Sequence, residues 1–234
     1  MFPFDPITVG SALILAGASP KICQIPKPAE ISVVPTSKPL IIDTERTLAE
    51  IGNQNIDTIN PYGYNHTTHT NGFMEGGISM RSTVSLDYKQ APQRNAFCLW
   101  YDKITIDIEI DPKIVIAKEV AADKCMYNAV LTHEKKHVNV DRKIANKYAR
   151  AMGKIVFDGL KQRGFIAGPI PPENTQEISD RMKKTVSQLI QLEYKKMEIE
   201  RAEAQQAVDS LQEYEFVRSR CPDYESPAAA SRSR

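Results

Sequence analysis

The most informative stretch of this sequence is Leu131-Thr132-His133-Glu134-Lys135-Lys136-His137-Val138-Asn139-Val140-Asp141, which contains the pattern H-E-x-x-H. In a helix, His133 and His137 lie one turn apart and point the same way. Two imidazoles in this arrangement can bind one tetrahedral metal ion, usually zinc. Glu134 lies beside them, where its carboxylate can take a proton from an attacking water. The pattern therefore predicts a Zn²⁺ site with Glu134 as the catalytic base.

The residues around the motif repeat at the spacing of one helix face. Both histidines fall in line with apolar side chains that recur every three or four positions, namely Met126, Val130, Val140, Ile144, Tyr148, Met152 and Ile155. The histidines thus occupy core positions, and a buried imidazole needs a polar partner. A shared metal supplies that partner for both rings. The alternative is a pair of core histidines held by ordinary hydrogen bonds.

The motif helix is expected to be the first of two. It should begin near residue 122 and end at Arg163, with Gly164 as its C-terminal cap. A turn rich in Gly and Pro follows at 168–172. Residues 174–177 resemble a capping box, and neither Gly nor Pro interrupts the chain from there to about Ser219. The pattern predicts a long antiparallel helical hairpin.

Extended segments precede these helices. Between residues 104 and 110, isoleucine alternates with polar residues, which is the period of a strand with one buried face. We expect Pro112 to end this strand, and further strands at 78–88, 96–101 and 114–116. The predicted fold class is α+β: a small, mainly antiparallel sheet followed by the helical hairpin that carries H-E-x-x-H on its first helix.

Length and composition indicate one domain with appendages. We expect a Pro-rich linker at 19–40, an H-E-x-x-H domain at 41–221 and a disordered tail at 222–234. The formal net charge of +1 gives no reason to expect nucleic acid as a partner. There is no run of about 18 apolar residues, so no membrane span is expected.

The N-terminal residues resemble a targeting segment. An apolar run at 7–18 ends in Ala16-Gly17-Ala18, which resembles a signal-peptidase site, so residues 1–18 are read as a possible signal segment. No Lys or Arg precedes the run, and Asp5 carries the opposite charge, so the alternative is a peripheral apolar tail. The first reading predicts a secreted or periplasmic protein.

Four cysteines, Cys23, Cys98, Cys125 and Cys221, are scattered along the chain without a C-x-x-C pair. An even number is compatible with two disulfides in an oxidising compartment, and free buried thiols are the alternative in the cytosol. We expect a bond between Cys98 and Cys125, because one lies beside the Trp100 strand and the other in the first turn of the motif helix. Such a bond would join sheet to helix.

A catalytic zinc normally keeps three protein ligands, so one more is needed. Asp141 lies on the same face, but about 12 Å along the helix axis from His133. If the hairpin pairs positions that sum to about 337, His133 faces residue 204 and His137 faces Glu200. Glu200 is therefore the predicted third ligand. The substitutes, if the hairpin slips or a loop contributes, are Glu203, Asp209 and His69.

The motif region resembles a bacterial family of uncharacterised secreted zinc-dependent proteases, over about residues 75–215. In that family H-E-x-x-H is followed by an apolar residue, Asp and an apolar residue; here Asn139 stands in place of the acid. Residues 148–150 match the family's Tyr-Ala-Arg about one turn later. Asp209 resembles the start of its second-helix signature, whose histidine has no counterpart here. The resemblance implies a sheet before the motif helix and a second long helix after it.

Motif and resemblance together predict zinc-dependent hydrolysis of peptide bonds in the bacterial cell envelope, with a peptide or protein as substrate. The alternative is a non-catalytic helical interaction module that keeps a structural metal or a polar cluster. The second helix has a thin apolar stripe, and such a face can bind a protein partner.

Overall fold

The protein is described from a computed structural model. The residues that the structure describes are 7–9, 22–24, 26–52, 70–92 and 95–225. They form two compact units. The first contains the described parts of Met1–Thr36, Ser79–Glu109 and Ala145–Met197, and the second those of Ser37–Ile78, Ile110–Ile144 and Glu198–Arg234.

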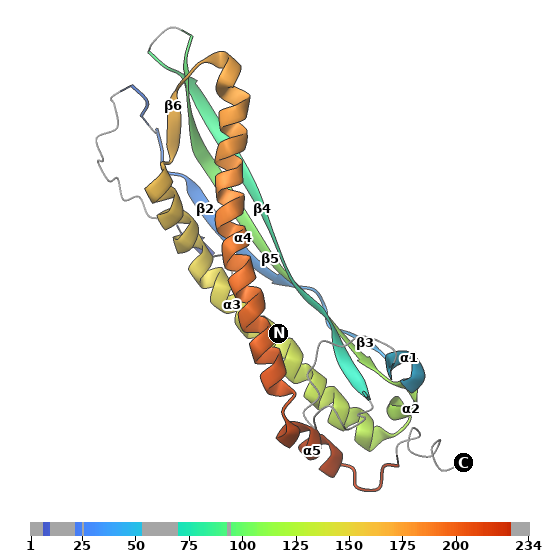
Figure 1. The fold of residues 1–234 in the computed structure, drawn as a ribbon. Coiled ribbons are helices and arrows are strands. Elements are labelled where there is room, and N and C mark those ends of the chain that lie inside the picture. The colour runs from blue at the N-terminus through green and yellow to red at the C-terminus, as the bar shows by residue number, and fades with distance from the viewer. Residues whose placement is uncertain (1–6, 10–21, 25, 53–69, 93–94, 226–234) are drawn as a thin grey trace. The chain divides into compact units, whose positions relative to one another are not determined.

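A sheet runs through the first unit (Figure 1). Its strands are β1 (Ile7–Val9), β2 (Glu30–Ser37), β4 (Gly72–Gln90), β5 (Phe97–Ile116) and β6 (Ile166–Ile170), of which β2, β4 and β5 continue into the second unit. β1 is antiparallel to β2, and β6 is antiparallel to β5. β2 and β4 also pair with β5, so β5 is the strand around which the sheet is built.

The alternation predicted along β5 is confirmed. Ile104, Ile106 and Ile108 are fully buried, whereas Thr105 and Asp107 between them are half-buried and exposed. This places one face of the strand in the core of the first unit and the other toward water.

Two long helices cover the sheet in this unit (Figure 1). They are α3 (Lys124–Arg163) and α4 (Thr175–Val208), joined through Gly164, β6 and a short 3-10 turn at Pro172–Asn174. Apart from Glu193 of α4, their buried side chains here are apolar, namely Ala145, Ala149, Met152, Val156 and Leu160 from α3, and Met182, Val186, Ile190 and Met197 from α4. The hydroxyl of Tyr101 on β5 donates to the Met182 carbonyl at 2.9 Å, which joins sheet to helix.

The second unit contains the remaining short elements. These are β3 (Ile41–Asp43), α1 (Leu48–Gly52), α2 (Lys118–Ala121) and α5 (Leu211–Ser219). β3 pairs in parallel with the end of β5, so the sheet is partly parallel, where the sequence predicted mainly antiparallel pairing. The first turns of α3 pack on an apolar cluster formed by Ile51, Ile114, Val115, Ile116, Ala117, Val120, Met126, Val130, Val138 and Cys221.

Pro112 does not end the strand, contrary to the prediction. β5 continues through it to Ile116, and Pro112 is buried. A proline's fixed φ is compatible with extended backbone, and the lost N–H removes only one ladder bond. The neighbouring β3 pairs at Lys113 to Val115, and Gly76 of β4 lies so close to the Asp111 carbonyl that an added Cβ would be 1.9 Å from it. Strands on both sides therefore carry β5 past the proline.

The predicted helices are confirmed in part. The motif helix was expected from about 122 to 163 and spans Lys124–Arg163, with Gly164 at a φ of 98° donating to the Leu160 carbonyl at 2.7 Å. The second helix was expected to run unbroken to about Ser219, but α4 ends at Val208. Ser210 then caps α5, its hydroxyl accepting from the Glu213 N–H at 3.3 Å. A serine at this position starts a new helix because it satisfies an amide that the first turn leaves free.

The Pro-rich segment is part of the sheet. Residues 30–37 form β2, with Ile31 and Val33 buried, so the predicted linker at 19–40 does not describe this stretch. Of the possible signal segment at 1–18, only β1 lies within the described residues, and that prediction stays a prediction. Most of the tail predicted at 222–234 lies outside the described residues.

The four cysteines form two disulfides, one in each unit. Cys23 is bonded to Cys98 and Cys125 to Cys221, with Cα–Cα distances of 5.6 and 5.9 Å. The predicted Cys98–Cys125 bond is wrong, because each of these two residues is bonded to a different cysteine. Two disulfides are consistent with an oxidising compartment.

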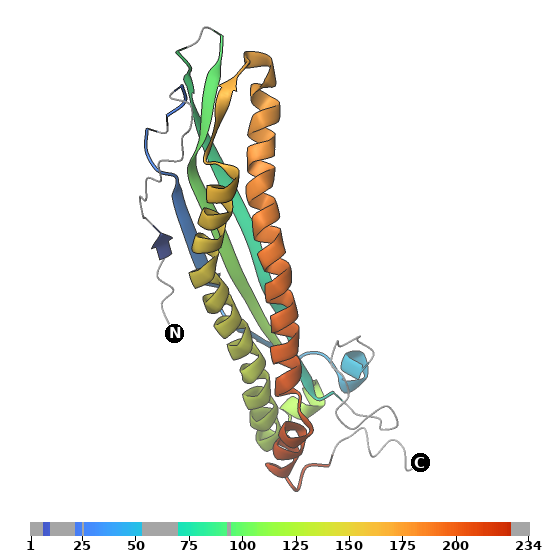
Figure 2. The same ribbon diagram turned by 60° about the vertical axis from the view of Figure 1, so that its left-hand side comes forward.

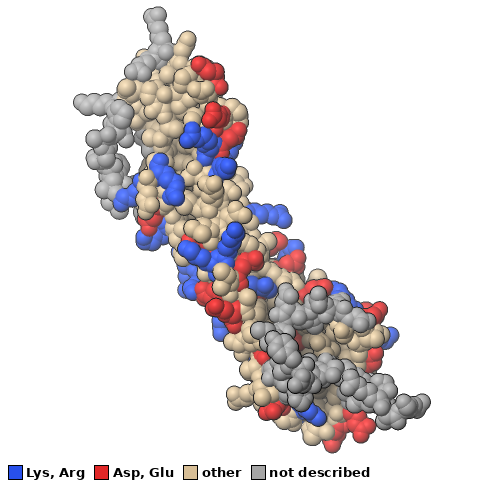
Figure 3. Space-filling view, viewed as in Figure 1, with Lys and Arg blue, Asp and Glu red and all other residues tan. Residues whose placement is uncertain are grey.

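No helix within the described ranges is long and apolar enough to cross a membrane. On the face drawn in Figure 3, lysine and arginine are interspersed with aspartate and glutamate. This mixed surface agrees with a formal net charge of +1.

Candidate metal centre

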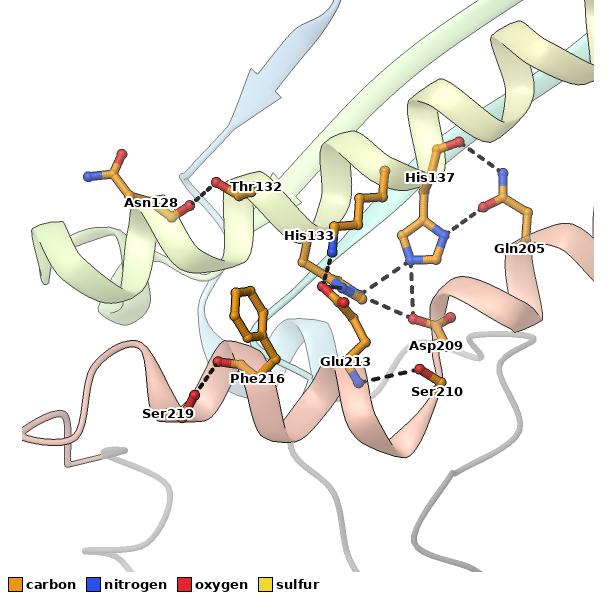
Figure 4. A network of polar contacts seen from close by, with 11 residues as sticks. Asn128, Thr132, His133, His137, Gln205, Asp209, Ser210, Glu213, Phe216 and Ser219 are labelled. Atoms are coloured by element: carbon orange, nitrogen blue, oxygen red, sulfur yellow. Dashed lines mark hydrogen bonds and ion pairs between the residues drawn. The ribbon is translucent and has the colours of Figure 1, made fainter.

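Three buried polar side chains of the second unit meet at one point (Figure 4). His133 and His137 project from one face of α3, and Asp209 follows the last turn of α4. The Asp209 Oδ1 atom is 3.2 Å from the Nε2 atom of His133 and 3.1 Å from that of His137. The two Nε2 atoms are 3.4 Å apart, and all three side chains are less than 10% exposed. This cluster could hold a metal ion.

The donor triangle has the dimensions of a metal site. In a tetrahedral zinc site with ligand distances of about 2.0 to 2.1 Å, neighbouring donor atoms lie about 3.3 to 3.4 Å apart. The three separations here, 3.1, 3.2 and 3.4 Å, are close to that edge length. An ion in contact with all three atoms therefore needs no large rearrangement of the side chains.

The tautomer of His137 follows from its neighbour Gln205. The Gln205 Nε2 donates to the His137 carbonyl at 3.2 Å and to the Asp141 Oδ1 at 2.7 Å, and both partners are acceptors. The amide oxygen must then face the ring, and it lies 2.6 Å from the His137 Nδ1. Since Nδ1 carries the proton in this contact, the neutral ring presents a lone pair at Nε2.

His133 is oriented in the same sense by Glu213 on α5. Its Nδ1 lies 3.5 Å from the Glu213 Oε1, and a carboxylate accepts only, so the proton is again assigned to Nδ1. Lys136 donates to the same Oε1 at 2.5 Å and holds the carboxylate in place. Two imidazole lone pairs and a carboxylate oxygen thus converge on one point, an arrangement that favours a proton or a metal ion between them.

The acidic and basic groups of the cluster stabilise one another's charged forms. Burial opposes ionisation of both histidines, but the hydrogen bonds to Asp209 and the charge of Glu134 outweigh it and raise the pKa of His133 and of His137. Burial likewise opposes ionisation of Asp209, yet its hydrogen bonds to the two histidines hold its pKa well below the usual range. An ionised Asp209 therefore favours positive charge at this point.

Glu134 is buried near both histidines. Its side chain is 4% exposed, and its carboxylate accepts a hydrogen bond from the Met74 backbone on β4. Burial raises the pKa of Glu134 to about 7, although the nearby histidines lower it. A carboxylate with a pKa near neutrality can both accept and return a proton, which is what a general base needs.

Asp209 takes the position that the sequence assigned to Glu200. Glu200 and Glu203 are not part of the cluster found among the described residues, Glu203 is exposed, and His69 lies outside those residues. The reason is the register of α3 and α4: partner positions add to 342 (133 and 209, 137 and 205, 141 and 201) in place of the predicted sum of about 337. The connection between the helices contains β6 and a 3-10 turn. Residues at equal numbers of positions before and after this connection therefore do not lie opposite each other.

Sequence reasoning missed Gln205 and Glu213 as supporting residues. They belong to a run of polar residues spaced by four, Arg201, Gln205, Asp209 and Glu213, which opposes a second run, His133, His137 and Asp141. Spacing by four keeps successive side chains on one helix face. That periodicity was present in the sequence and could have identified them.

Comparison of the chain with protein-family models, with curated proteins and with solved structures found no match. The metal centre is therefore inferred from its own donor atoms and their hydrogen-bond partners.

Proposed function

We propose that the protein is a zinc-dependent metallopeptidase that hydrolyses peptide bonds in the bacterial cell envelope. The observation that carries the proposal is the convergence of the His133 and His137 Nε2 lone pairs with the Asp209 Oδ1, next to a buried Glu134. Two nitrogens and one carboxylate oxygen are a common donor set for catalytic zinc. The resemblance of the motif helix to secreted zinc-dependent proteases supports the same class.

The residues have complementary roles in this proposal. His133, His137 and Asp209 would hold the ion, which supplies a polarised substrate carbonyl and water of lowered pKa. Glu134 takes the proton from the attacking water and passes it to the leaving amine. Gln205 and Glu213 keep both imidazole rings oriented for binding.

An envelope location is supported by the two disulfides, which persist in oxidising compartments. Peptides and proteins are abundant substrates there. The possible signal segment at 1–18 and a substrate of this kind are both part of the proposal.

A combined metal and activity measurement tests the function. Purified wild-type protein should contain about one zinc per chain and cleave a mixed peptide library, with cleavage products read by mass spectrometry. Glu134→Gln should keep the zinc and lose cleavage by about a hundredfold or more. Zinc-loaded wild-type protein that cleaves no faster than Glu134→Gln would refute the peptidase.

The second candidate is a non-catalytic interaction module with a structural metal. The low exposure of all three ligand side chains favours it, since structural metal sites are closed to solvent. Leu192 and Ile199 on α4 are 55% and 63% exposed, which would suit a protein partner. This candidate predicts tightly held zinc, a large loss of thermal stability on chelation and no hydrolysis in the same assay.

A further inference from the structure

Gln205 contacts His137 through both ends of its side-chain amide. Its side-chain amide makes three hydrogen bonds: the nitrogen donates to the His137 carbonyl and to Asp141, and the oxygen accepts from the His137 Nδ1. One residue thus binds both the backbone and the ring of a single histidine. The contact to the ring, at 2.6 Å, is much shorter than the 3.5 Å contact by which Glu213 reaches His133.

Asp141 and Arg201 fix the orientation of the Gln205 amide. Asp141 is completely buried and accepts twice from Arg201, from its Nε at 2.7 Å and from its Nη2 at 3.1 Å. Arg201 also donates to the Gly76 carbonyl on β4 at 3.3 Å. Because the Asp141 carboxylate acts as the acceptor from Arg201 and has no donor to offer, the nitrogen end of the Gln205 amide must face it.

The orientation of the Gln205 amide controls which ring nitrogen of His137 carries the proton. If its nitrogen faced the ring, Nδ1 would need to be the acceptor, and the proton of the neutral ring would move to Nε2. A proton at Nε2 would occupy the direction in which that atom points toward Asp209 and the donor triangle. The orientation of the amide therefore decides whether His137 offers a lone pair to a metal.

We propose that Gln205 is a positioning residue that fixes the metal-binding tautomer of His137, and that Asp141 and Arg201 hold its amide in the required orientation. The inference rests on the metal centre of the proposed function and not on peptide hydrolysis. Partners of this kind typically contribute ten- to hundredfold to metal affinity.

The experiment measures zinc affinity by competition with a chromophoric chelator, in full-length protein with both disulfides formed. Gln205→Met keeps the length of the side chain and removes its hydrogen bonds, so zinc affinity should fall about ten- to hundredfold. Gln191→Met makes the same chemical change at an exposed position of α4 in the first unit and should bind zinc as wild type does.

Two further readouts separate positioning from a merely structural effect. The visible absorption of the cobalt-substituted protein should change in Gln205→Met, because the ligand field at His137 changes, and should stay unchanged in Gln191→Met. Arg201→Met, which releases Asp141, should weaken zinc binding by about three- to tenfold, less than loss of the amide itself. Thermal unfolding of the metal-free variants identifies any that fail to fold.

The outcomes are distinct. Equal zinc affinity and equal cobalt spectra for folded Gln205→Met and Gln191→Met would overturn the positioning role. A wild-type protein that binds no zinc overturns the positioning role together with the metal centre. Absence of hydrolysis alone contradicts the peptidase and leaves the affinity comparison valid.

Discussion

The helices α3 and α4 contact each other in two chemically different ways. In the first unit the contact is apolar and close: a Cβ added at Gly159 would lie 2.7 Å from the Leu189 side chain. In the second unit the contact is polar, with His133, His137 and Asp141 of α3 opposite residues spaced by four. Figure 2 shows α5, which extends the polar contact, beside the first turns of α3.

The difference separates what stabilises a fold from what specifies a site. Apolar packing is roughly proportional to buried area and accepts many pairings of similar shape. Hydrogen-bonded polar pairs must each be satisfied, because an unpaired buried polar group costs about 1 to 3 kcal/mol. The polar half is therefore the part of the helix pair whose register cannot slip.

Removing either disulfide alone gives the largest expected loss of stability. The disulfides join residues separated by 75 and 96 positions, for which loop-closure entropy suggests about 4 to 5 kcal/mol each. Denaturant unfolding should show similar losses for the double-serine variants Cys23→Ser/Cys98→Ser and Cys125→Ser/Cys221→Ser.

Only the second pair should also weaken zinc binding, because Cys221 follows α5 and Cys125 opens α3, the helix that carries both histidines. The same chelator competition measures this. If the Cys23→Ser/Cys98→Ser protein loses as much zinc affinity as the other, the two units are not separable in this way.

Asp209→Ala should lower zinc affinity about a thousandfold, or about 4 kcal/mol, since three ligands share a binding free energy of about 10 to 16 kcal/mol. Glu203→Ala is the matched control, an exposed acid on α4 outside the cluster. Equal zinc affinities for the two variants, measured by titration calorimetry or chelator competition, would remove Asp209 from the site.

Met152→Ala tests the apolar packing of the helices in the first unit. Met152 is fully buried in the first unit, and truncation of such a side chain typically costs about 3 kcal/mol of unfolding free energy. Zinc affinity should be unchanged, in contrast to Asp209→Ala. If the Met152→Ala protein keeps wild-type stability, or if it loses zinc, then apolar packing in the first unit and zinc binding in the second are not separate contributions.

Tyr101→Phe gives the smallest expected effect, about 1 kcal/mol, through loss of the hydrogen bond to the Met182 carbonyl. Burial raises the pKa of Tyr101 to about 12 from its ordinary value of 10.0. The unfolded chain therefore loses this proton first, so the contribution of Tyr101 is complete below about pH 10 and declines toward pH 12. Wild-type stability should fall more steeply than that of Tyr101→Phe across this range, and parallel curves would contradict the assignment.

Local periodicity determined much of this protein from sequence alone. The spacing of three and four gave the motif helix to within two residues of its start, and the period of two gave the buried isoleucines of β5. H-E-x-x-H gave the two histidines that meet in the structure. These features depend on residues close together in the chain, whose geometry is fixed by the helix or strand itself.

Tertiary structure decided everything that depends on contacts between distant segments. Asp209, and not Glu200, faces the histidines because β6 and the 3-10 turn shift the register of α4 by about five residues, more than one helical turn. Cys125 pairs with Cys221 because the chain returns to the start of α3 after α5. β5 passes through Pro112 because strands on both sides hold it. In each case the local sequence is compatible with several ligands, cysteine pairings or strand ends, and packing between segments far apart in the chain selects one of them.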